Sequence, residues 1–180
     1  MAELSEATIK DSIKTALTTL FSGQPLKAAK GISDEELNAV YSLAYSYYST
    51  GKYDDALKLF KFLVMFDHLN AKYWDGLGSV HQVQKNYDDA IAAYAQSVML
   101  DSSNPRPVYY SALCYFAKGE KLHAAASVQA FEMLCTKKDE TTAKYREKIA
   151  ALKAALGDDT FKELERIEAE DRAKKAAKKA

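Results

Sequence analysis

The chain has 180 residues, enough for one domain with a buried core, and its 25 basic residues balance 25 acidic ones. Because this balance gives no global field, the composition argues against nucleic acid or an anionic membrane surface as the main ligand. Only seven glycines and three prolines accompany an apolar content of 48%, which favours long regular elements, and the Ala, Leu, Lys and Glu content favours helices.

The N-terminal stretch predicts an amphipathic helix over residues 6–21, with its apolar residues on one face. That face has to be covered either by the domain that follows or by another copy of the chain. We expect self-association through four of its residues, which are Ile9, Ile13, Leu17 and Leu20. Residues 1–32 are therefore interpreted as a helix and a linker, and they show neither a signal peptide nor a membrane span.

A second helix is predicted over residues 34–50, before Gly51. Ser33 and Glu36 have the spacing of a capping box at its start. The helix carries two neighbouring apolar stripes with helical spacing. One stripe consists of Tyr41, Tyr45 and Tyr48, and the other of Val40, Leu43, Ala44 and Tyr47.

The same residue types return at an interval of 34, which indicates a repeated unit. Members of this register are Tyr53 and Tyr87; Ala56, Ala90 and Ala124; Ala44, Gly78 and Ala112; Leu43 and Leu77; Phe60 and Tyr94. The spacing resembles the tetratricopeptide repeat, a helix-turn-helix unit of that length, in three units over about 37–70, 71–104 and 105–138. The register assigns the stripe with Leu43 to the core. Two departures are Lys85 in place of a turn glycine, and Ser111 and Lys121 in place of large apolar residues of the third unit.

The C-terminal part predicts a helix over residues 141–156 that caps the open end of the solenoid. Residues 157–180 have few apolar positions and carry acidic and then basic residues, which is typical of a solvated helix that frays towards its end. The expected fold class is all-α: three tetratricopeptide repeats in a right-handed helical solenoid, with an N-terminal amphipathic helix and a C-terminal capping helix. Residues 33–156 would form the repeat domain.

Catalysis finds little support in the sequence, so the chain is predicted not to be an enzyme. The histidines His68, His81 and His123 are isolated and lack the spacing of metal ligands. No phosphate-binding glycine loop or nucleophile motif is present. The two cysteines, Cys114 and Cys135, are interpreted as reduced thiols rather than a disulfide. No cofactor and no metal is therefore expected.

A binding groove is the predicted functional feature. With the second stripe in the core, Tyr41, Tyr45 and Tyr48 are left to face the concave side of the solenoid. The register extends this ridge to Asp75, Ser79 and Gln82 and then to Tyr109, Leu113 and Phe116, preceded by Lys72 and Arg106. Such a surface suits an extended peptide of about six residues, held by apolar anchors and main-chain hydrogen bonds. The alternative interpretation is that these tyrosines only cover the N-terminal helix or help the helices to stack.

The strings YSLAYSYYSTGKYDDALKLFKFLVMFDH, YWDGLG and NPRPVYYSALCY make the chain similar to the class II chaperones of bacterial type III secretion. The resemblance extends over about residues 5–155, and the charged tail after Leu156 is a departure from it. It implies an ATP-independent chaperone of the bacterial cytoplasm that keeps hydrophobic translocator proteins soluble and competent for export. It further implies that a client segment of the pattern Pro-x-Leu-x-x-Pro binds at Tyr41, Tyr45, Tyr48, Phe60 and Arg106, and that the chaperone forms a homodimer through its N-terminal helix.

A generic repeat adaptor that assembles a protein complex stays open as the alternative function. The variant that clamps a C-terminal carboxylate is disfavoured, because it needs basic and amide residues at positions occupied here by Tyr41, Tyr45, Gly76, Arg106 and Tyr110. Only Arg106 has the required character.

Overall fold

The computed structural model describes residues 10–11, 14–15, 18, 22–136 and 139–177, and all secondary structure within them is helical. The helices are α2 (Leu26–Lys30), α3 (Asp34–Ser49), α4 (Tyr53–Phe66), α5 (Ala71–Val83), α6 (Tyr87–Leu100), α7 (Pro105–Ala117), α8 (Lys121–Leu134), α9 (Glu140–Leu156) and α10 (Asp158–Ala177). The all-α prediction is confirmed. The proposed self-association residues Ile9, Ile13, Leu17 and Leu20 lie outside the described part of the chain.

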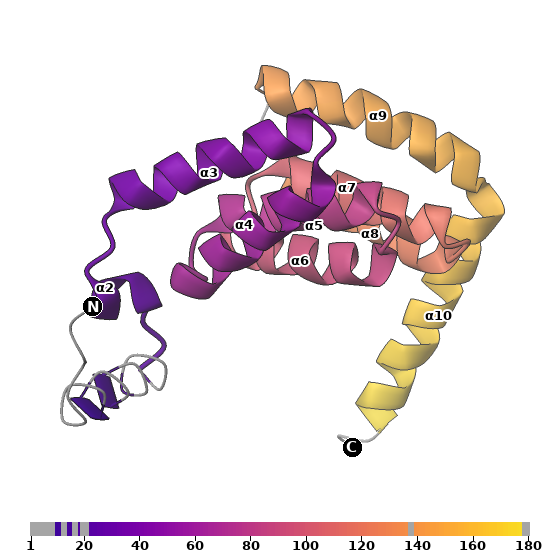
Figure 1. The fold of residues 1–180 in the computed structure, drawn as a ribbon. Helices are drawn as coiled ribbons and strands as arrows, with labels where there is room; N and C mark the ends of the chain where they lie inside the picture. Colours follow the sequence, from indigo (N-terminus) through magenta and orange to yellow (C-terminus); the bar gives the residue numbers. More distant parts are fainter. Residues whose placement is uncertain (1–9, 12–13, 16–17, 19–21, 137–138, 178–180) are drawn as a thin grey trace.

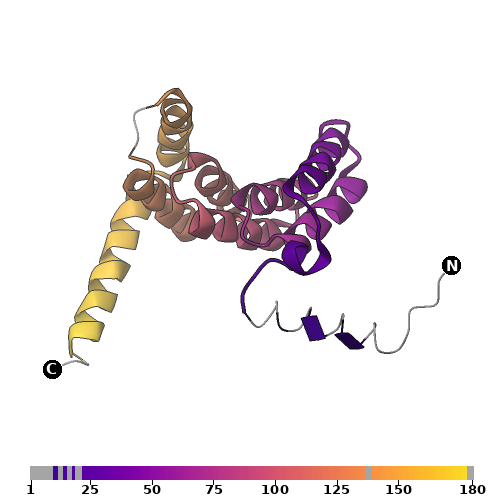
Figure 2. The ribbon, with the colours of Figure 1, turned by 90° about the vertical axis from the view of Figure 1, so that its left-hand side faces the viewer.

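Successive helices pair into three units, α3 with α4, α5 with α6 and α7 with α8, and each unit packs against the next. The view nearly along the axes of the repeat helices shows a U (Figure 2), in which α3 and α9 stand in the two arms and the repeat helices between them form the base. The helix that follows the repeats therefore stands opposite the first repeat helix across the concave side.

The helix starts follow from local side-chain chemistry. Ser33 accepts a hydrogen bond from the Glu36 amide at 3.1 Å, and the Glu36 carboxylate accepts one from the Ser33 amide at 2.8 Å, which completes the predicted capping box. Asn70 and Asn104 cap α5 and α7 in the same position, 34 residues apart. Because each repeat begins at a fixed cap, the register of 34 residues fixes which side chains face inward.

The core runs through the repeats as buried clusters. Small register positions let the paired helices approach closely, and five of them have no exposed surface: Ala44, Ala56, Ala90, Ala112 and Ala124. The prediction that Leu43 belongs to the core is wrong, because 47% of its surface is exposed. Its register partner Leu77 is 8% exposed, since Leu77 packs in the cluster shared by the first two units, whereas α3 is the first helix of the stack.

The turn between the paired helices needs a left-handed residue in every unit. Gly51 and Gly119 adopt φ angles of 78° and 79° there. The register places Lys85 at the same turn of the second unit, and Lys85 takes a φ of 63° although it has a Cβ. The departure noted in the sequence is thus a strained residue in an unchanged turn.

Two segments differ from their sequence-based description. The linker before α3 contains the short helix α2, and Lys27 ties it to the repeats through ion pairs with Asp34 at 2.6 Å and with the buried Asp67 at 2.7 Å. The C-terminal helix α10 is not solvated throughout. Its first half packs on α8, and Leu164 is 8% exposed within the core cluster of the third unit, with Phe161 beside it.

Candidate functional site

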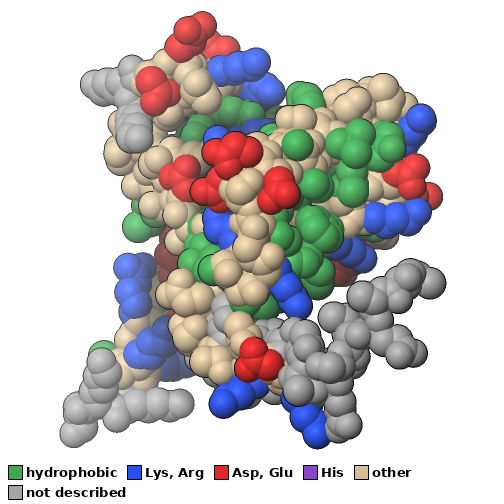
Figure 3. All heavy atoms as spheres, turned by 60° about the vertical axis from the view of Figure 1, so that its left-hand side comes forward, with side chains coloured by type: hydrophobic (Ala, Val, Ile, Leu, Met, Phe, Trp, Pro, Cys, Tyr) green, Lys and Arg blue, Asp and Glu red, His purple; other side chains and the backbone are tan. Residues whose placement is uncertain are grey.

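A pocket of about 230 Å³ lies on the concave side, where α3, α4, α5 and α7 meet. Its lining consists of Tyr41, Tyr45, Tyr48, Phe60, Asp75, Gly76, Ser79 and Arg106. Seven of these residues are among the ten that the sequence placed in a groove. Figure 3 shows hydrophobic side chains gathered on one face of the molecule, with acidic and basic side chains among them.

The aromatic wall of the pocket comes from one helix face. Tyr41 is half-buried and meets the Phe60 ring edge to face, with the ring centroids 6.0 Å apart. Tyr48 lies 6.4 Å from Tyr45 by the same measure, and Tyr45 is 58% exposed. Burial raises the pKa of Tyr41 and of Tyr48 above that of a free phenol, so both hydroxyls stay protonated and can donate hydrogen bonds.

The floor of the pocket depends on a missing side chain. A Cβ at Gly76 of α5 would overlap the ring of Phe60, which is itself 2% exposed. The ring lies directly against the α5 backbone at this point, so Gly76 gives the pocket its depth. The repeat register gave no signal for this residue, because the equivalent positions are Ser42 and Tyr110.

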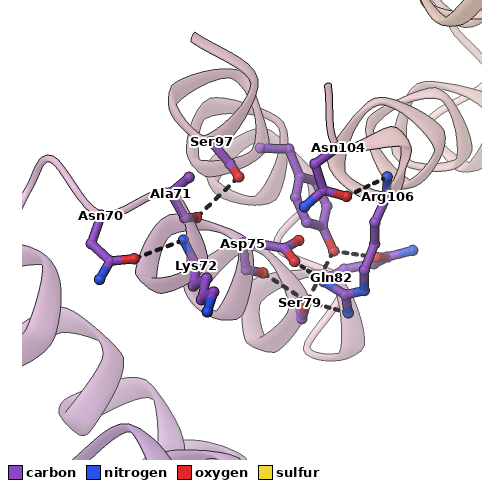
Figure 4. Close-up of polar contacts among 10 residues, drawn as sticks. Asn70, Ala71, Lys72, Asp75, Ser79, Gln82, Ser97, Asn104 and Arg106 are labelled. Atoms are coloured by element: carbon purple, nitrogen blue, oxygen red, sulfur yellow. Dashed lines mark hydrogen bonds and ion pairs between the residues drawn. The ribbon is translucent and has the colours of Figure 1, made fainter. Parts of the chain in front are cut away.

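The polar side of the pocket is an ion pair between Asp75 and Arg106, which join α5 to α7. The guanidinium also donates a hydrogen bond to Ser79 Oγ at 3.0 Å, as Figure 4 shows. Burial raises the pKa of Asp75, and the neighbouring Arg106 opposes that shift. Burial alone would lower the pKa of Arg106, but the charge and the hydrogen bond of Asp75 raise it overall, so each partner favours the charged form of the other.

A tyrosine of the second unit supports this network from below. The Tyr94 hydroxyl donates to Gln82 Oε1 at 2.7 Å and lies 3.4 Å from Ser79 Oγ. One carboxylate oxygen of Asp75, Oδ1, is buried without a hydrogen-bond partner. The middle of the groove therefore presents oriented polar groups between aromatic side chains.

Three of the ten predicted groove residues lie outside this pocket. Lys72 is exposed near the start of α5. Tyr109 contacts Tyr145 of α9, with ring centroids 5.4 Å apart, and Leu113 packs against the core of the third unit. The third unit is therefore covered by α9, and α9 rather than α7 forms the arm opposite α3 (Figure 2).

Two further tyrosines extend the aromatic surface from the pocket to α9. Tyr110 lies under the Arg106 guanidinium, whose Cζ is 5.0 Å from the ring centroid, and its ring is 6.5 Å from that of Tyr145. Sequence reasoning placed neither residue in the groove. Tyr145 lies beyond the third unit, where α9 starts 35 residues after α7, so the register of 34 no longer applies.

The described residues offer no constellation for catalysis or metal binding. No group of three or more His, Cys, Asp or Glu side chains among them could hold a metal ion. His81 is buried, and burial lowers the pKa of its imidazole. Both cysteines are free and buried, and burial raises the pKa of Cys114 to about 12, which keeps it an unreactive thiol. None of the helices examined is both long and apolar enough to cross a bilayer.

A stack of helical hairpins with an aromatic and polar pocket on its concave side defines a tetratricopeptide-repeat protein with a candidate peptide site. The tetratricopeptide repeat family matches the chain over residues 37–70 and 71–104. The predicted fold class is confirmed.

Individual relatives define the family more narrowly. The chain is 30% identical to the chaperone protein SicA of Salmonella typhimurium over 154 residues, which cover 84% of this chain and 90% of SicA. It is 36% identical to the low calcium response locus protein H of Yersinia pestis over 109 residues, which cover 61% of this chain and 65% of that protein, slightly less than two thirds.

A solved structure agrees with these relatives. The type III secretion chaperone SycD of Yersinia enterocolitica, in complex with a peptide of the translocator YopD, superposes with a TM-score of 0.66 at 32% identity, covering 69% of this chain and 95% of SycD. SycD, a type III secretion translocator chaperone, has also been solved as an alternative dimer. The chain belongs to this family of type III secretion chaperones, as the sequence motifs predicted.

Proposed function

We propose that this protein is a cytoplasmic chaperone of a bacterial type III secretion system, and that it binds an extended segment of a hydrophobic translocator protein between α3 and α9. The observation that carries this proposal is the pocket of about 230 Å³ that gathers Tyr41, Tyr45, Tyr48, Phe60 and Arg106 from three helices. The related SycD is known in complex with a translocator peptide, which supports the same kind of client here.

The pocket suits an extended apolar segment. The rings of Tyr45 and Tyr48 offer flat, partly exposed surface on which a leucine side chain or a proline ring packs without a cost in aromatic rotamer freedom. The partly buried pair of Asp75 and Arg106, together with Ser79, lies at the base, where main-chain amide and carbonyl groups of the client find oriented partners. Apolar contacts supply the affinity, and the polar base sets the position of the segment.

No catalysis enters this function. Covering an apolar segment removes surface that would otherwise drive aggregation or membrane insertion of the client. A client without fixed structure loses conformational entropy when it binds, so its affinity is modest for the area buried and release needs no chemical step. The buried thiols and histidine described above have no part in it.

Self-association belongs to the proposal as well. We infer a homodimer from the amphipathic pattern of residues 6–21, and the dimer form of SycD supports it. Sedimentation of a chain that lacks residues 1–30 tests this: the mass should fall to that of a monomer, and an unchanged mass would contradict the inferred interface.

The client site is tested by co-expression with translocator candidates from the same genome. Replacing Tyr45 and Tyr48 by alanine should abolish co-purification and leave the client insoluble, because both rings line the pocket. Tyr45 is 58% exposed, whereas Tyr48 also packs partly against the core of the first unit. Leu43→Ala is the matched control, since Leu43 lies on the same helix, is 47% exposed and is absent from the pocket lining.

Normal client solubility with the double tyrosine variant would show that the groove assignment is wrong. If the variant also retained folded partners in the cell, the generic adaptor would become the better description.

A further inference from the structure

The α9 side of the groove carries a cation held against two aromatic rings. Lys148 is half-buried, and its Nζ lies 5.4 Å from the ring centroid of Tyr109 and 5.2 Å from that of Tyr145. None of the ion pairs found among the described residues involves Lys148. Arg106, the other cation of the groove, is instead paired with Asp75. Lys148 therefore brings to the groove a positive charge that forms no ion pair with a described carboxylate.

No acidic residue of α9 lies three or four positions from Lys148, where it would be a neighbour on the helix surface. The residues four and three positions before Lys148 are Lys144 and Tyr145, and those three and four positions after it are Ala151 and Leu152. Two like charges at a spacing of four residues weaken a helix, and an acidic residue at any of these positions would have stabilised it. Glu140 and Glu147 stand at such spacings from Lys144, whereas no acidic residue stands at such a spacing from Lys148.

This cation is continuous with the pocket. The Tyr145 ring contacts Tyr110, and Tyr110 lies under Arg106, which lines the pocket. Arg106 shares the pocket lining with Tyr48 of α3, so contacts through Arg106 and Tyr110 link the α3 wall of the pocket to Tyr145 of α9. Three successive ring contacts of 5.0, 6.5 and 5.2 Å lead from Arg106 to Lys148, a span of no more than about five extended residues. A segment that crosses the groove from the α3 pocket therefore reaches Lys148.

We propose that Lys148, held between Tyr109 and Tyr145, forms a second subsite of the groove that binds an aspartate or glutamate side chain of the client, adjacent to the apolar segment in the pocket. This inference rests on the proposed function. The ammonium group donates charge-assisted hydrogen bonds to the carboxylate, and the two rings fix the lysine stem so that little rotamer freedom is lost on binding. Because Arg106 is already paired with Asp75, it does not compete for the same carboxylate.

Fluorescence anisotropy with matched peptides tests the subsite. The probes are fluorescein-labelled peptides of the pattern Pro-x-Leu-x-x-Pro with two aspartates added either before or after the pattern, and the same peptides with two asparagines. We expect one aspartate peptide to bind the full-length protein about five-fold more tightly than its asparagine partner at low salt, and the difference to shrink as salt screens the pair.

Lys148→Gln should remove this preference and leave the affinity for the asparagine peptide unchanged. The matched control is Lys153→Gln, which removes a charge from the same helix where Lys153 pairs with Glu132 of α8, and it should keep the full preference. Equal affinity of wild-type protein for the aspartate and asparagine peptides would overturn the subsite alone, as would an equal loss of both affinities in Lys148→Gln. If wild-type protein bound none of the peptides, the proposed function would fail together with the subsite.

Discussion

Lys85 shows how the repeat constrains a single residue. The turn of each unit closes through a left-handed residue, which is glycine in the first and third units and lysine in the second. The side chain of Lys85 is exposed and the backbone turn is still hydrogen-bonded, from the Lys85 amide to Gln82 and from the Asn86 amide to His81. The strain at Lys85 is therefore tolerated because the cap and the packing of α5 and α6 determine the turn.

Lys85→Gly should stabilise the protein by about 0.5–1 kcal/mol, since relief of the left-handed strain exceeds the added flexibility of the unfolded chain. Urea unfolding followed by circular dichroism measures the change. The converse substitution is Gly51→Ala at the equivalent turn of the first unit. It should lower the free energy of unfolding by about 1 kcal/mol, because no side-chain contact compensates the left-handed strain. A glycine variant no more stable than the wild type would show that the strain at Lys85 does not exceed the entropy that glycine adds to the unfolded chain.

At the scale of the helix, α5 is the element that shapes the groove. It provides Asp75, Gly76 and Ser79 to the pocket, and it lies between the tyrosine helix α3 and the arginine helix α7. The α5 helix contributes only small and polar residues to the pocket lining, and the aromatic rings of the lining come from α3 and α4. Glycine has a low helix propensity, but at position 76 it allows the Phe60 ring to lie directly against the α5 backbone.

Gly76→Ala tests this dependence. The added methyl group would push the Phe60 ring into the pocket, so peptide affinity should fall at least about ten-fold, while overpacking lowers stability by about 1–3 kcal/mol. Peptide anisotropy measured at a temperature where the variant is folded separates the two effects.

Ala124→Val serves as the comparison for Gly76→Ala, because it overpacks the fully buried core of the third unit away from the pocket. It should lose similar stability and keep its affinity. Equal losses of affinity in both variants would mean that the effect is general destabilisation and not a change of pocket shape.

Much of the molecule could be predicted because the repeat converts sequence position into spatial position. The interval of 34 residues alone predicts that residues of α3, α5 and α7 share one groove, and six of those residues line the pocket. The register could not reach α9, since its cap at Asp139 falls outside the interval, and so Tyr145 and Lys148 were missed. The register also could not predict the exposure of Leu43, because equivalent register positions differ in burial when one helix lies at the end of the stack.

The C-terminal helix α10 lies at one end of the molecule, and only part of it contributes to the core. In Figure 1, α10 leaves the stack and runs away from it. Its first half contributes Phe161 and the buried Leu164 to the third core cluster, whereas residues 169–177 are exposed throughout.

A chain that ends at Asp171 should therefore unfold like the full-length protein, because the described residues that it loses, 172–177, are all exposed. A chain that ends at Leu156 loses the burial of two large apolar side chains and uncovers part of α8, so its free energy of unfolding should fall by about 3 kcal/mol. Parallel urea titrations of the three chains decide between these outcomes. If the chain that ends at Leu156 kept the full free energy of unfolding, α10 would contribute nothing to the stability of the fold. If the chain that ends at Asp171 already lost about 3 kcal/mol, the exposed charged half of α10 would have a structural role that its lack of buried residues does not predict.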